Sequence, residues 1–257
     1  MENIVFGIRP VAEAIESGKQ IEKIYIRKGA EGQLMMDLKD LCYRHRRHYQ
    51  EVPVEKLNRM TRGNHQGVVA VIAAIEYVEV QDILDRVPED ETPLIIVFDN
   101  VTDVRNFGGI ARSAECAGAH GIISSLKNSA PVNAESIRSS AGALTRIPVA
   151  RVGSIRNTLK SLQAQGFQIV AATEHSRKLM YDADLTKPTV IVMGSEENGI
   201  SKEVLKLCDE QLAIPMIGAI ESLNVSAAAA IMIFEVVRQR IGYYYLNHWI
   251  RYTNTLV

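Results

Sequence analysis

Short apolar runs recur along the second half of the chain, separated by polar or helical stretches. The runs lie at residues 94–99, 121–123, 167–172 and 189–193. Near-continuous apolar runs of this kind are typical of strands buried on both faces of a parallel sheet. The stretches between them, such as Ser154–Gln165, have helical or loop character. This alternation predicts an α/β domain with a mainly parallel sheet and helices on both faces.

A long apolar stretch, Val225–Phe234, follows a polar loop and leads into a charged segment. Ser222 and Asn224 are good N-cap residues, because a short side-chain oxygen can accept a hydrogen bond from a first-turn N–H. We therefore predict a helix that is buried at its start and solvated at its end. Upstream, Leu212–Pro215 is predicted to be a short strand. The loop 216–223 then follows the carboxyl end of a strand, where open α/β sheets bind ligands.

Residues 1–75 alternate between helical and strand-like stretches over shorter distances. These stretches are Phe6–Ile15 (helix), Ile21–Ile26 (strand), Leu34–Arg47 (helix) and Val68–Ile75 (strand). We predict a small α/β domain here. The following segment, 76–92, carries seven acidic residues against one basic and contains a proline, so we interpret it as an acidic linker. The second domain is then predicted to comprise residues 93–257.

The net charge of −1 conceals the charge of the two predicted domains. Residues 1–75 carry 12 Lys and Arg against 9 Asp and Glu, and residues 93–257 carry 16 against 14. Both are mildly basic, which leaves the partner open. The run YRHRRH at 43–48 could be the RNA-facing end of a helix, but short charged runs are more often a solvated helix face. The same choice applies to His65, with a structural role favoured over an RNA contact.

Cysteine usage and hydropathy exclude several classes of protein. Cys42, Cys116 and Cys208 are far apart and form no CxxC pair, so we predict neither disulfides nor a zinc site and expect buried, reduced thiols. No window reaches the ~18 apolar residues that a membrane span requires, and the first ten residues lack the pattern of a signal peptide. The chain is therefore predicted to be cytoplasmic and independent of membranes.

The loop after the first strand of the second domain, NVTDVRNFGGIAR at 100–112, passes into a predicted helix. Asn106 is a candidate N-cap for this helix. Arg112 lies six residues further on, too far round the helix to share one close contact with Asn106 by periodicity alone. From the pattern alone we favour a structural interpretation, with Asp103 and Asn106 as turn and cap residues, Gly108 and Gly109 as sites of close packing, and Arg112 as a surface residue.

The loop VMGSEENGIS at 192–201 also follows a predicted strand. Its glycines allow the backbone to approach a ligand closely, and Glu196 or Glu197 could accept hydrogen bonds from ligand hydroxyls or an amine. The sequence contains neither a GxGxxG after the first strand nor a GKS or GKT, so a dinucleotide site and a P-loop are not supported. The pattern predicts a site at the strand ends without naming its ligand.

Together these loops resemble a known set of motifs. NxxDxxNxGxIxR at 100–112, MGSEENGIS at 193–201 and IPM…SLNVS at 214–226 resemble the three motifs of the SpoU/TrmH family. Its members are RNA 2′-O-ribose methyltransferases of the SPOUT superfamily that use S-adenosylmethionine. The resemblance implies a homodimer and a trefoil knot. General rules of chain topology would have excluded the knot. FGIRPVAEAI at 6–15 and HQGVVA at 65–70 resemble the N-terminal RNA substrate-binding domain of members that methylate a guanosine of 23S ribosomal RNA.

The resemblance also implies which residues form the site. The catalytic residues would be Asn106, Arg112, Glu196, Ser222 and Asn224. The residues that bind S-adenosyl-L-methionine would be Gly194, Glu196, Ile214, Met216, Ser222, Leu223 and Asn224. No metal is implied. Methyl transfer to a 2′-hydroxyl requires alignment of two partners and removal of one proton. A free guanidinium stays protonated at neutral pH, so Arg112 is expected to grip an RNA phosphate and steady the developing alkoxide.

Two features depart from the family pattern. Val104 and Arg105 stand where members often have Pro-His, and the aromatic tail 241–257 extends beyond the usual last helix. We expect this tail to pack on the body or on a dimer partner. One alternative function is a tRNA 2′-O-ribose methyltransferase. Another is a non-enzymatic RNA-binding or ribosome assembly protein, which would be expected to have lost Arg112 or the loop with Gly194.

Overall fold

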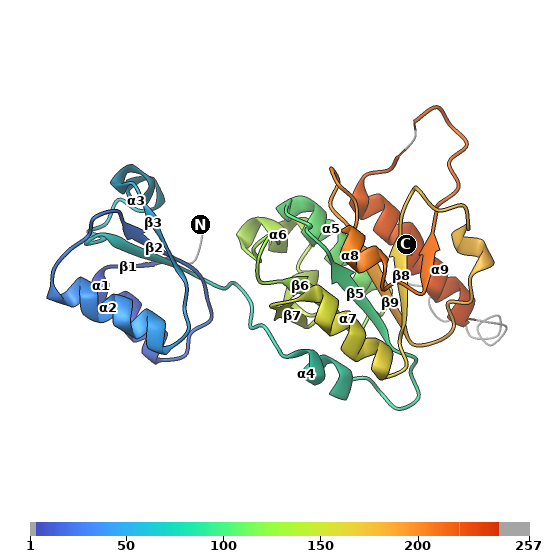
Figure 1. The fold of residues 1–257 in the computed structure, drawn as a ribbon, viewed down its shortest axis with the longest axis horizontal. Helices are drawn as coiled ribbons and strands as arrows, with labels where there is room; N and C mark the ends of the chain where they lie inside the picture. Colours follow the sequence, from blue (N-terminus) through green and yellow to red (C-terminus); the bar gives the residue numbers. More distant parts are fainter. Residues whose placement is uncertain (1–3, 221, 242–257) are drawn as a thin grey trace, which may run out of the picture. The chain divides into compact units, whose positions relative to one another are not determined.

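The structure is a computed structural model that describes residues 4–220 and 222–241. It divides into two compact units (Figure 1). The first comprises the chain up to Glu76 together with the short segment Pro131–Ala134, and the second comprises the rest. The tail beyond residue 241, for which we expected packing on the body or on a partner, lies outside the described residues. Each unit is described by itself below.

The first unit is a four-stranded mixed sheet with helices on both faces. Its strand order is β1-β4-β2-β3, where β2 pairs antiparallel with β4 and parallel with β3. The strands are β1 (Ile4–Phe6), β2 (Ile21–Arg27), β3 (Tyr49–Val52) and β4 (Val68–Ile72), and the helices are α1 (Ile8–Glu16), α2 (Gln33–Arg44) and α3 (Val54–Met60). The predicted α/β character of this region is confirmed.

Alternation along β2 explains how both faces of this sheet are covered. Ile24 and Ile26 point toward α1 and α2, while Tyr25 between them packs with Leu57 of α3. Successive side chains of a strand point to opposite faces, so one buried strand serves two cores. Strand β3, which we did not predict, has only Val52 buried among its four residues.

The loop before β4 is held by its own hydrogen bonds. The His65 ring accepts from the Gly67 N–H at Nδ1 (3.0 Å), so its proton lies on Nε2, which bonds Asn58 Oδ1 at 2.9 Å. Gln66 Oε1 accepts from the Ile8 N–H at 3.1 Å, at the start of α1. Both ring nitrogens of His65 are thus occupied within the fold, which favours the structural role.

The second unit is a six-stranded sheet in which every pairing is parallel, in the order β10-β8-β9-β5-β6-β7. The strands are β5 (Leu94–Phe98), β6 (Gly121–Ser125), β7 (Val149–Val152), β8 (Gln168–Ala172), β9 (Thr189–Met193) and β10 (Glu210–Leu212). The helices are α4 (Val80–Asp85), α5 (Val104–Cys116), α6 (Ala134–Ser139), α7 (Ile155–Ala164), α8 (Lys202–Leu205) and α9 (Val225–Ile241), with short 3-10 turns at Ala143–Thr145 and Met180–Asp182. The predicted parallel sheet is confirmed. The trefoil knot stays a prediction from the family resemblance, because strand order alone does not trace it.

Helices cover both faces of this sheet (Figure 1). All residues of the central strands β5 and β9 are buried. Ile95 and Val97 join a core with α4, α7 and α8. On the opposite face, the Phe98 ring packs edge-on against Phe107 of α5, with 4.6 Å between ring centroids. Burial on both faces explains why these strands read as continuous apolar runs.

The segment that we interpreted as a linker belongs largely to the second unit. Val78 forms a parallel bridge with Ala150, and residues 80–85 form helix α4. Ile83 of this helix is fully buried, and a Cβ at Gly121 would collide with its side chain. The acidic composition misled us because α4 fully buries only Ile83, while Gln81, Asp82 and Asp85 are exposed.

The burial expected for α9 holds at its start, where Val225 and Ala229 are buried, but is wrong further along the helix. Glu235 is buried and accepts hydrogen bonds from Arg238 and Gln239. Burial lowers the pKa of Arg240 to about 10, which leaves it charged at neutral pH. Its guanidinium donates to the carbonyl oxygens of Thr92, Pro93, Leu185 and Lys187. Ile231 and Phe234 are exposed instead, so an apolar strip of the helix faces outward.

The cysteines also differ from expectation. Burial raises the pKa of Cys208 to about 12 and raises that of the fully buried Cys42, as inert thiols require. Cys116 at the end of α5 is exposed, so the prediction of three buried thiols is wrong for this residue. Among residues 4–220 and 222–241 there is no cluster that could hold a metal ion, and none of their helices is long and apolar enough to cross a membrane.

Candidate functional site

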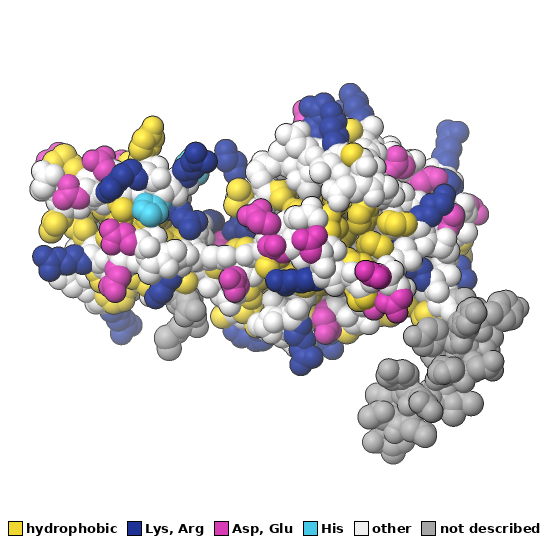
Figure 2. Space-filling model, turned by 90° about the horizontal axis from the view of Figure 1, so that it is seen from below, with side chains coloured by type: hydrophobic (Ala, Val, Ile, Leu, Met, Phe, Trp, Pro, Cys, Tyr) yellow, Lys and Arg dark blue, Asp and Glu magenta, His cyan; other side chains and the backbone are white. Residues whose placement is uncertain are grey.

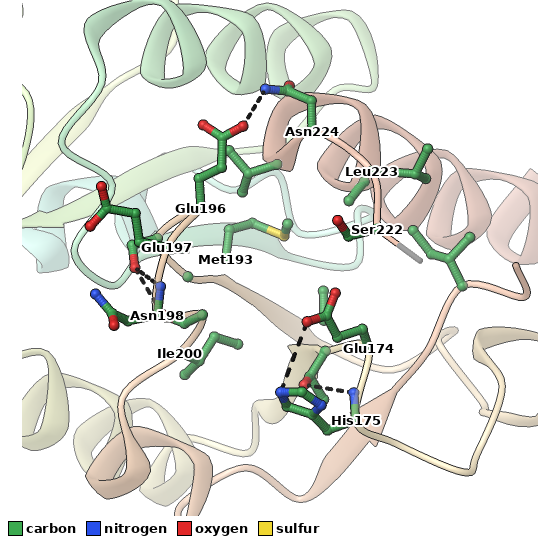
Figure 3. A pocket seen from close by; sticks show the side chains of 18 of the residues that line it. Glu174, His175, Met193, Glu196, Glu197, Asn198, Ile200, Ser222, Leu223 and Asn224 are labelled. Carbon is green, nitrogen blue, oxygen red and sulfur yellow. Dashed lines mark hydrogen bonds and ion pairs between the residues drawn. The ribbon is translucent and has the colours of Figure 1, made fainter. Parts of the chain in front are cut away.

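A pocket of about 510 Å³ opens at the carboxyl ends of β8, β9 and β10, beside the start of α9 (Figure 3). Its position follows the rule that open parallel sheets bind ligands outside the carboxyl ends of their strands. The pocket lining includes every residue to which we assigned cofactor binding: Gly194, Glu196, Ile214, Met216, Ser222, Leu223 and Asn224. Strand β10 ends at Leu212, earlier than the predicted Pro215, so Ile214 is free to line the pocket from a loop.

The loop after β9 folds back on itself, which explains its first glycine. Ser195 and Gly199 exchange two backbone hydrogen bonds of 3.0 and 2.9 Å. A Cβ at Gly194 would overlap the backbone of Gly199 and Ile200. We expected this glycine to allow close approach of the backbone to a ligand, but a side chain there would first displace the loop itself. At the far end of the loop, the buried Asp99 carboxylate accepts from the Ser201 N–H at 2.7 Å.

Three side chains from the three motifs form one hydrogen-bond network. Asn224 Oδ1 accepts from the Ser226 N–H at 2.9 Å, so its amide nitrogen points the other way and donates to Asn106 Oδ1 at 3.0 Å. The amide nitrogen of Asn106 in turn donates to Glu196 Oε2 at 3.0 Å. Asn224 also donates to the other Glu196 oxygen at 3.4 Å. The start of α9 therefore sets the orientation of two amides and holds a carboxylate as an acceptor.

The caps of the two helices make this network possible. Asp103, rather than the predicted Asn106, caps α5: its carboxylate accepts from the N–H groups of Arg105 and Asn106 at 2.9 Å. The Asn106 side chain is thereby free to enter the site. Asn224 caps α9 as predicted. The close packing that we proposed for the glycines is confirmed, since a Cβ at Gly109 would come within 3.0 Å of the Ser226 Cβ.

The structure does not bring Arg112 to this pocket. The residue is exposed on α5, six positions beyond Asn106, and is absent from the pocket lining. Within the described part of the chain, its guanidinium forms no hydrogen bond or ion pair. Ser222, the remaining predicted catalytic residue, lines the pocket wall. Of the five predicted catalytic residues, three thus line the pocket, Asn106 is hydrogen-bonded to two of these three, and Arg112 stands apart.

The sequence reasoning missed one wall of the pocket. Thr173, Glu174 and His175 follow β8 and line the pocket. Glu174 and His175 lie on the side opposite Glu196 (Figure 3). The Glu174 carboxylate lies 3.9 Å from the His175 ring. We had predicted a strand ending at residue 172, so the strand-end rule could have identified these residues.

Two family models match this chain. The model of the SpoU rRNA Methylase family matches residues 93–234, and the model named RNA 2′-O ribose methyltransferase substrate binding matches residues 4–78. The chain belongs to the SpoU rRNA methylase family. The resemblance of the three motifs is thereby confirmed, and with it the expectation of an RNA 2′-O-methyltransferase that uses S-adenosylmethionine.

Relatives of this SpoU family member include both ribosomal RNA and tRNA enzymes. The 23S rRNA (guanosine-2′-O-)-methyltransferase RlmB of Vibrio parahaemolyticus is 35% identical over 93% of this chain and 97% of its own. The SpoU methyltransferase AviRb of Streptomyces viridochromogenes, solved with AdoMet, is 32% identical with a TM-score of 0.59, covering 93% and 91% of the two chains. The TrmH/SpoU tRNA modifying enzyme of A. aeolicus, 30% identical with a TM-score of 0.54, covers 62% of this chain and 81% of its own.

The residues of the pocket fit S-adenosylmethionine. Its volume is within the range of about 300–1,000 Å³ typical of small-molecule sites. Met193, Ile200 and Ile214 supply apolar walls suited to an adenine ring. Glu174 and Glu196 place carboxylates on opposite sides of the pocket, which suits a ligand with a sulfonium and an ammonium group.

Proposed function

We propose that this SpoU-family protein methylates the ribose 2′-hydroxyl of a guanosine in 23S ribosomal RNA, in the cytoplasm. The observation that carries the proposal is that this chain contains the first unit, which matches a substrate-binding model. The RlmB relative matches 93% of this chain, whereas the tRNA modifying enzyme of A. aeolicus matches 62%. The substrate-binding model covers residues 4–78. This region is about as long as the difference between the lengths of chain that the two relatives match. A substrate reader shared with a 23S rRNA enzyme favours ribosomal RNA over tRNA.

In this proposal the network at the pocket positions the reacting groups. When bound, S-adenosylmethionine supplies a methyl group activated by its sulfonium. Glu196, held by the amides of Asn106 and Asn224, accepts hydrogen bonds and is poorly placed to serve as a general base, because both of its oxygens are engaged. Arg112 then contributes from the RNA side, as a cation outside the pocket. The 2′-hydroxyl proton leaves to an RNA phosphate or to water.

The experiment that tests this function maps ribose methylation in RNA from cells with and without the gene. We expect one 2′-O-methylguanosine of 23S ribosomal RNA to disappear on deletion. The wild-type gene should restore it, and a Glu196→Ala gene should not. Loss of a methylated ribose from tRNA alone would favour the tRNA alternative, and unchanged methylation of all RNA would refute both.

The outward strip of α9 supports a homodimer. Ile231, Phe234 and Ile241 are spaced three and seven residues apart and are 37%, 47% and 38% exposed, which places them on one helix face. Leu223 and Ile217, at the mouth of the pocket and in its adjoining loop, are also exposed. An apolar strip continuous with the pocket loop is suited to a second copy of the chain, and twofold homodimers are the commonest assemblies.

We expect light scattering to give roughly twice the chain mass of 28.5 kDa at micromolar concentration. Phe234→Glu should convert this dimer to a monomer, because a carboxylate at the strip would have to be desolvated on association. The matched control is Met36→Glu, which makes a similar change at an exposed position of α2. If the wild type is an active monomer, or if both variants dissociate alike, the proposed interface is wrong.

A further inference from the structure

Four cations from three separate segments converge at one end of the sheet in the first unit. They are Arg9 at the start of α1, Arg27 and Lys28 at the end of β2, and Arg62 in the loop after α3. All four side chains are exposed. We call these four residues the basic end. The sequence does not show this cluster, because its members are spread over more than fifty positions.

Backbone contacts establish that the three segments meet. The Arg27 N–H bonds the Gly67 carbonyl at 2.8 Å, and the Gly7 N–H bonds the Val68 carbonyl at 3.1 Å. A Cβ at Gly63, next to Arg62, would overlap the ring of Phe6. The start of α1, the end of β2 and the loop after α3 therefore lie around the beginning of β4.

The charges of the basic end are not balanced within the described part of the chain. None of its four side chains forms an ion pair with a described residue. The acidic residues at this end of the sheet are Glu31, in the turn after β2, Glu55, in the first turn of α3, and Glu51, which lies beside Ile26 in the register of β3. Glu51 is paired with Lys39 at 2.8 Å and not with the basic end. On the face in Figure 2, acidic and basic side chains alternate over the unit, so the uncompensated charge is local.

We propose that the basic end binds phosphates of the substrate RNA away from the methylated ribose, and that the run at 43–48 does not. This inference rests on the proposed function. Strand β2 runs from Ile21 to Arg27, and α2 returns along it, so residues 44–48 lie at the opposite end of the sheet. Exposed Gly29, Gly63 and Asn64 beside the four cations leave room for a sugar-phosphate backbone to approach. Lys and Arg contacts to phosphates supply most of the salt-dependent affinity for RNA.

The test compares two fourfold variants of the full chain that remove equal charge from opposite ends of the sheet. The first carries Arg9→Gln, Arg27→Gln, Lys28→Gln and Arg62→Gln. The matched control carries Lys19→Gln, Arg44→Gln, Arg46→Gln and Arg47→Gln. Binding to an unmodified 23S ribosomal RNA transcript is measured between 50 and 200 mM salt. Thermal unfolding and S-adenosylhomocysteine binding report whether each variant is folded.

Neutralising four phosphate contacts should lower the slope of log affinity against log salt by about 3, at roughly 0.7 per contact to single-stranded RNA. The wild type should therefore lose roughly 50-fold more affinity than the basic-end variant over this salt range. The control should keep the wild-type slope. Equal slopes for the basic-end variant and the wild type, or a larger loss in the control, would overturn the proposal.

Two further outcomes are distinguishable. If the wild type methylates tRNA and does not bind 23S RNA, the proposed function fails, and the same pair of variants is then measured on that tRNA. If the basic-end variant binds every RNA as the wild type does but loses affinity for an acidic protein or for anionic vesicles, the basic end serves another partner, and the inference is wrong.

Discussion

Replacing Arg112 by alanine is expected to lower the single-turnover rate of methyl transfer by roughly 100- to 1,000-fold, the cost of losing a charged donor to a developing oxyanion. The affinity for S-adenosylmethionine should change by no more than about twofold, because Arg112 is absent from the lining of the pocket and its guanidinium bonds no described residue. Calorimetric binding and rapid-quench kinetics measure the two quantities separately. Loss of cofactor binding in Arg112→Ala would show that the residue supports the pocket instead.

The role of the guanidinium is tested by Arg112→Lys. A lysine retains the charge but lacks the planar fork that can hold two phosphate oxygens, so we expect little recovery of the rate. If Arg112 acted as the base, a lysine would become competent as it loses its proton. Substantial recovery of Arg112→Lys at alkaline pH, with an inflection absent from the wild type, would contradict the electrostatic role.

The exposure of Arg112 outside its own pocket raises the question of which site it serves in a dimer. Mixing Arg112→Ala protein with Glu196→Ala protein answers it. If Arg112 reaches the partner's pocket, half of the dimers regain one intact site, and activity should rise to about a quarter of wild type. If Arg112 acts beside its own pocket, every site in the mixture lacks one residue. Activity then stays at the level of the separate variants.

Burial on both faces made most of the second unit predictable. Strands β5 and β9 are buried throughout, so each is a continuous run of apolar residues. Such a run can be recognised as a strand without knowing which strands pair with it. Strand β7 at the edge of the sheet was missed, because only Val149 and Ala150 of its four residues are buried. Helix α4 was missed for the related reason that six residues with one buried position carry no periodic signal.

Local sequence patterns could not predict which residues of distant segments contact one another in the site. The sequence indicated three loops at strand ends, but not that Asn106 and Asn224, 118 residues apart, share a hydrogen bond. The cap of α5 was assigned to Asn106, whose side chain suits a cap as well as that of Asp103 does. Only the fold shows that Asp103 holds the first turn while Asn106 turns toward Glu196.

The hydrogen-bond network leads to a second large effect, in Asn106→Asp. The change keeps the shape of the side chain but replaces the amide nitrogen that donates to Glu196 Oε2 at 3.0 Å with an oxygen. Two carboxylates at about 4 Å near a protein surface repel each other by on the order of 4 kcal/mol, unless one of them takes up a proton. We expect the loops of the second and third motifs to lose their mutual position. Methyl transfer near pH 8 should fall by roughly 100-fold or more.

The sign of the pH dependence separates this explanation from a general loss of structure. Protonation of the new carboxylate restores a donor toward Glu196, so activity of Asn106→Asp relative to wild type should rise as the pH falls from 8 toward 5.5. Asn157→Asp adds the same charge at an exposed position of helix α7, across the sheet from α5, and should behave as wild type at every pH. If the activity of Asn106→Asp divided by that of the wild type stays constant across this pH range, the amide of Asn106 matters for its packing alone.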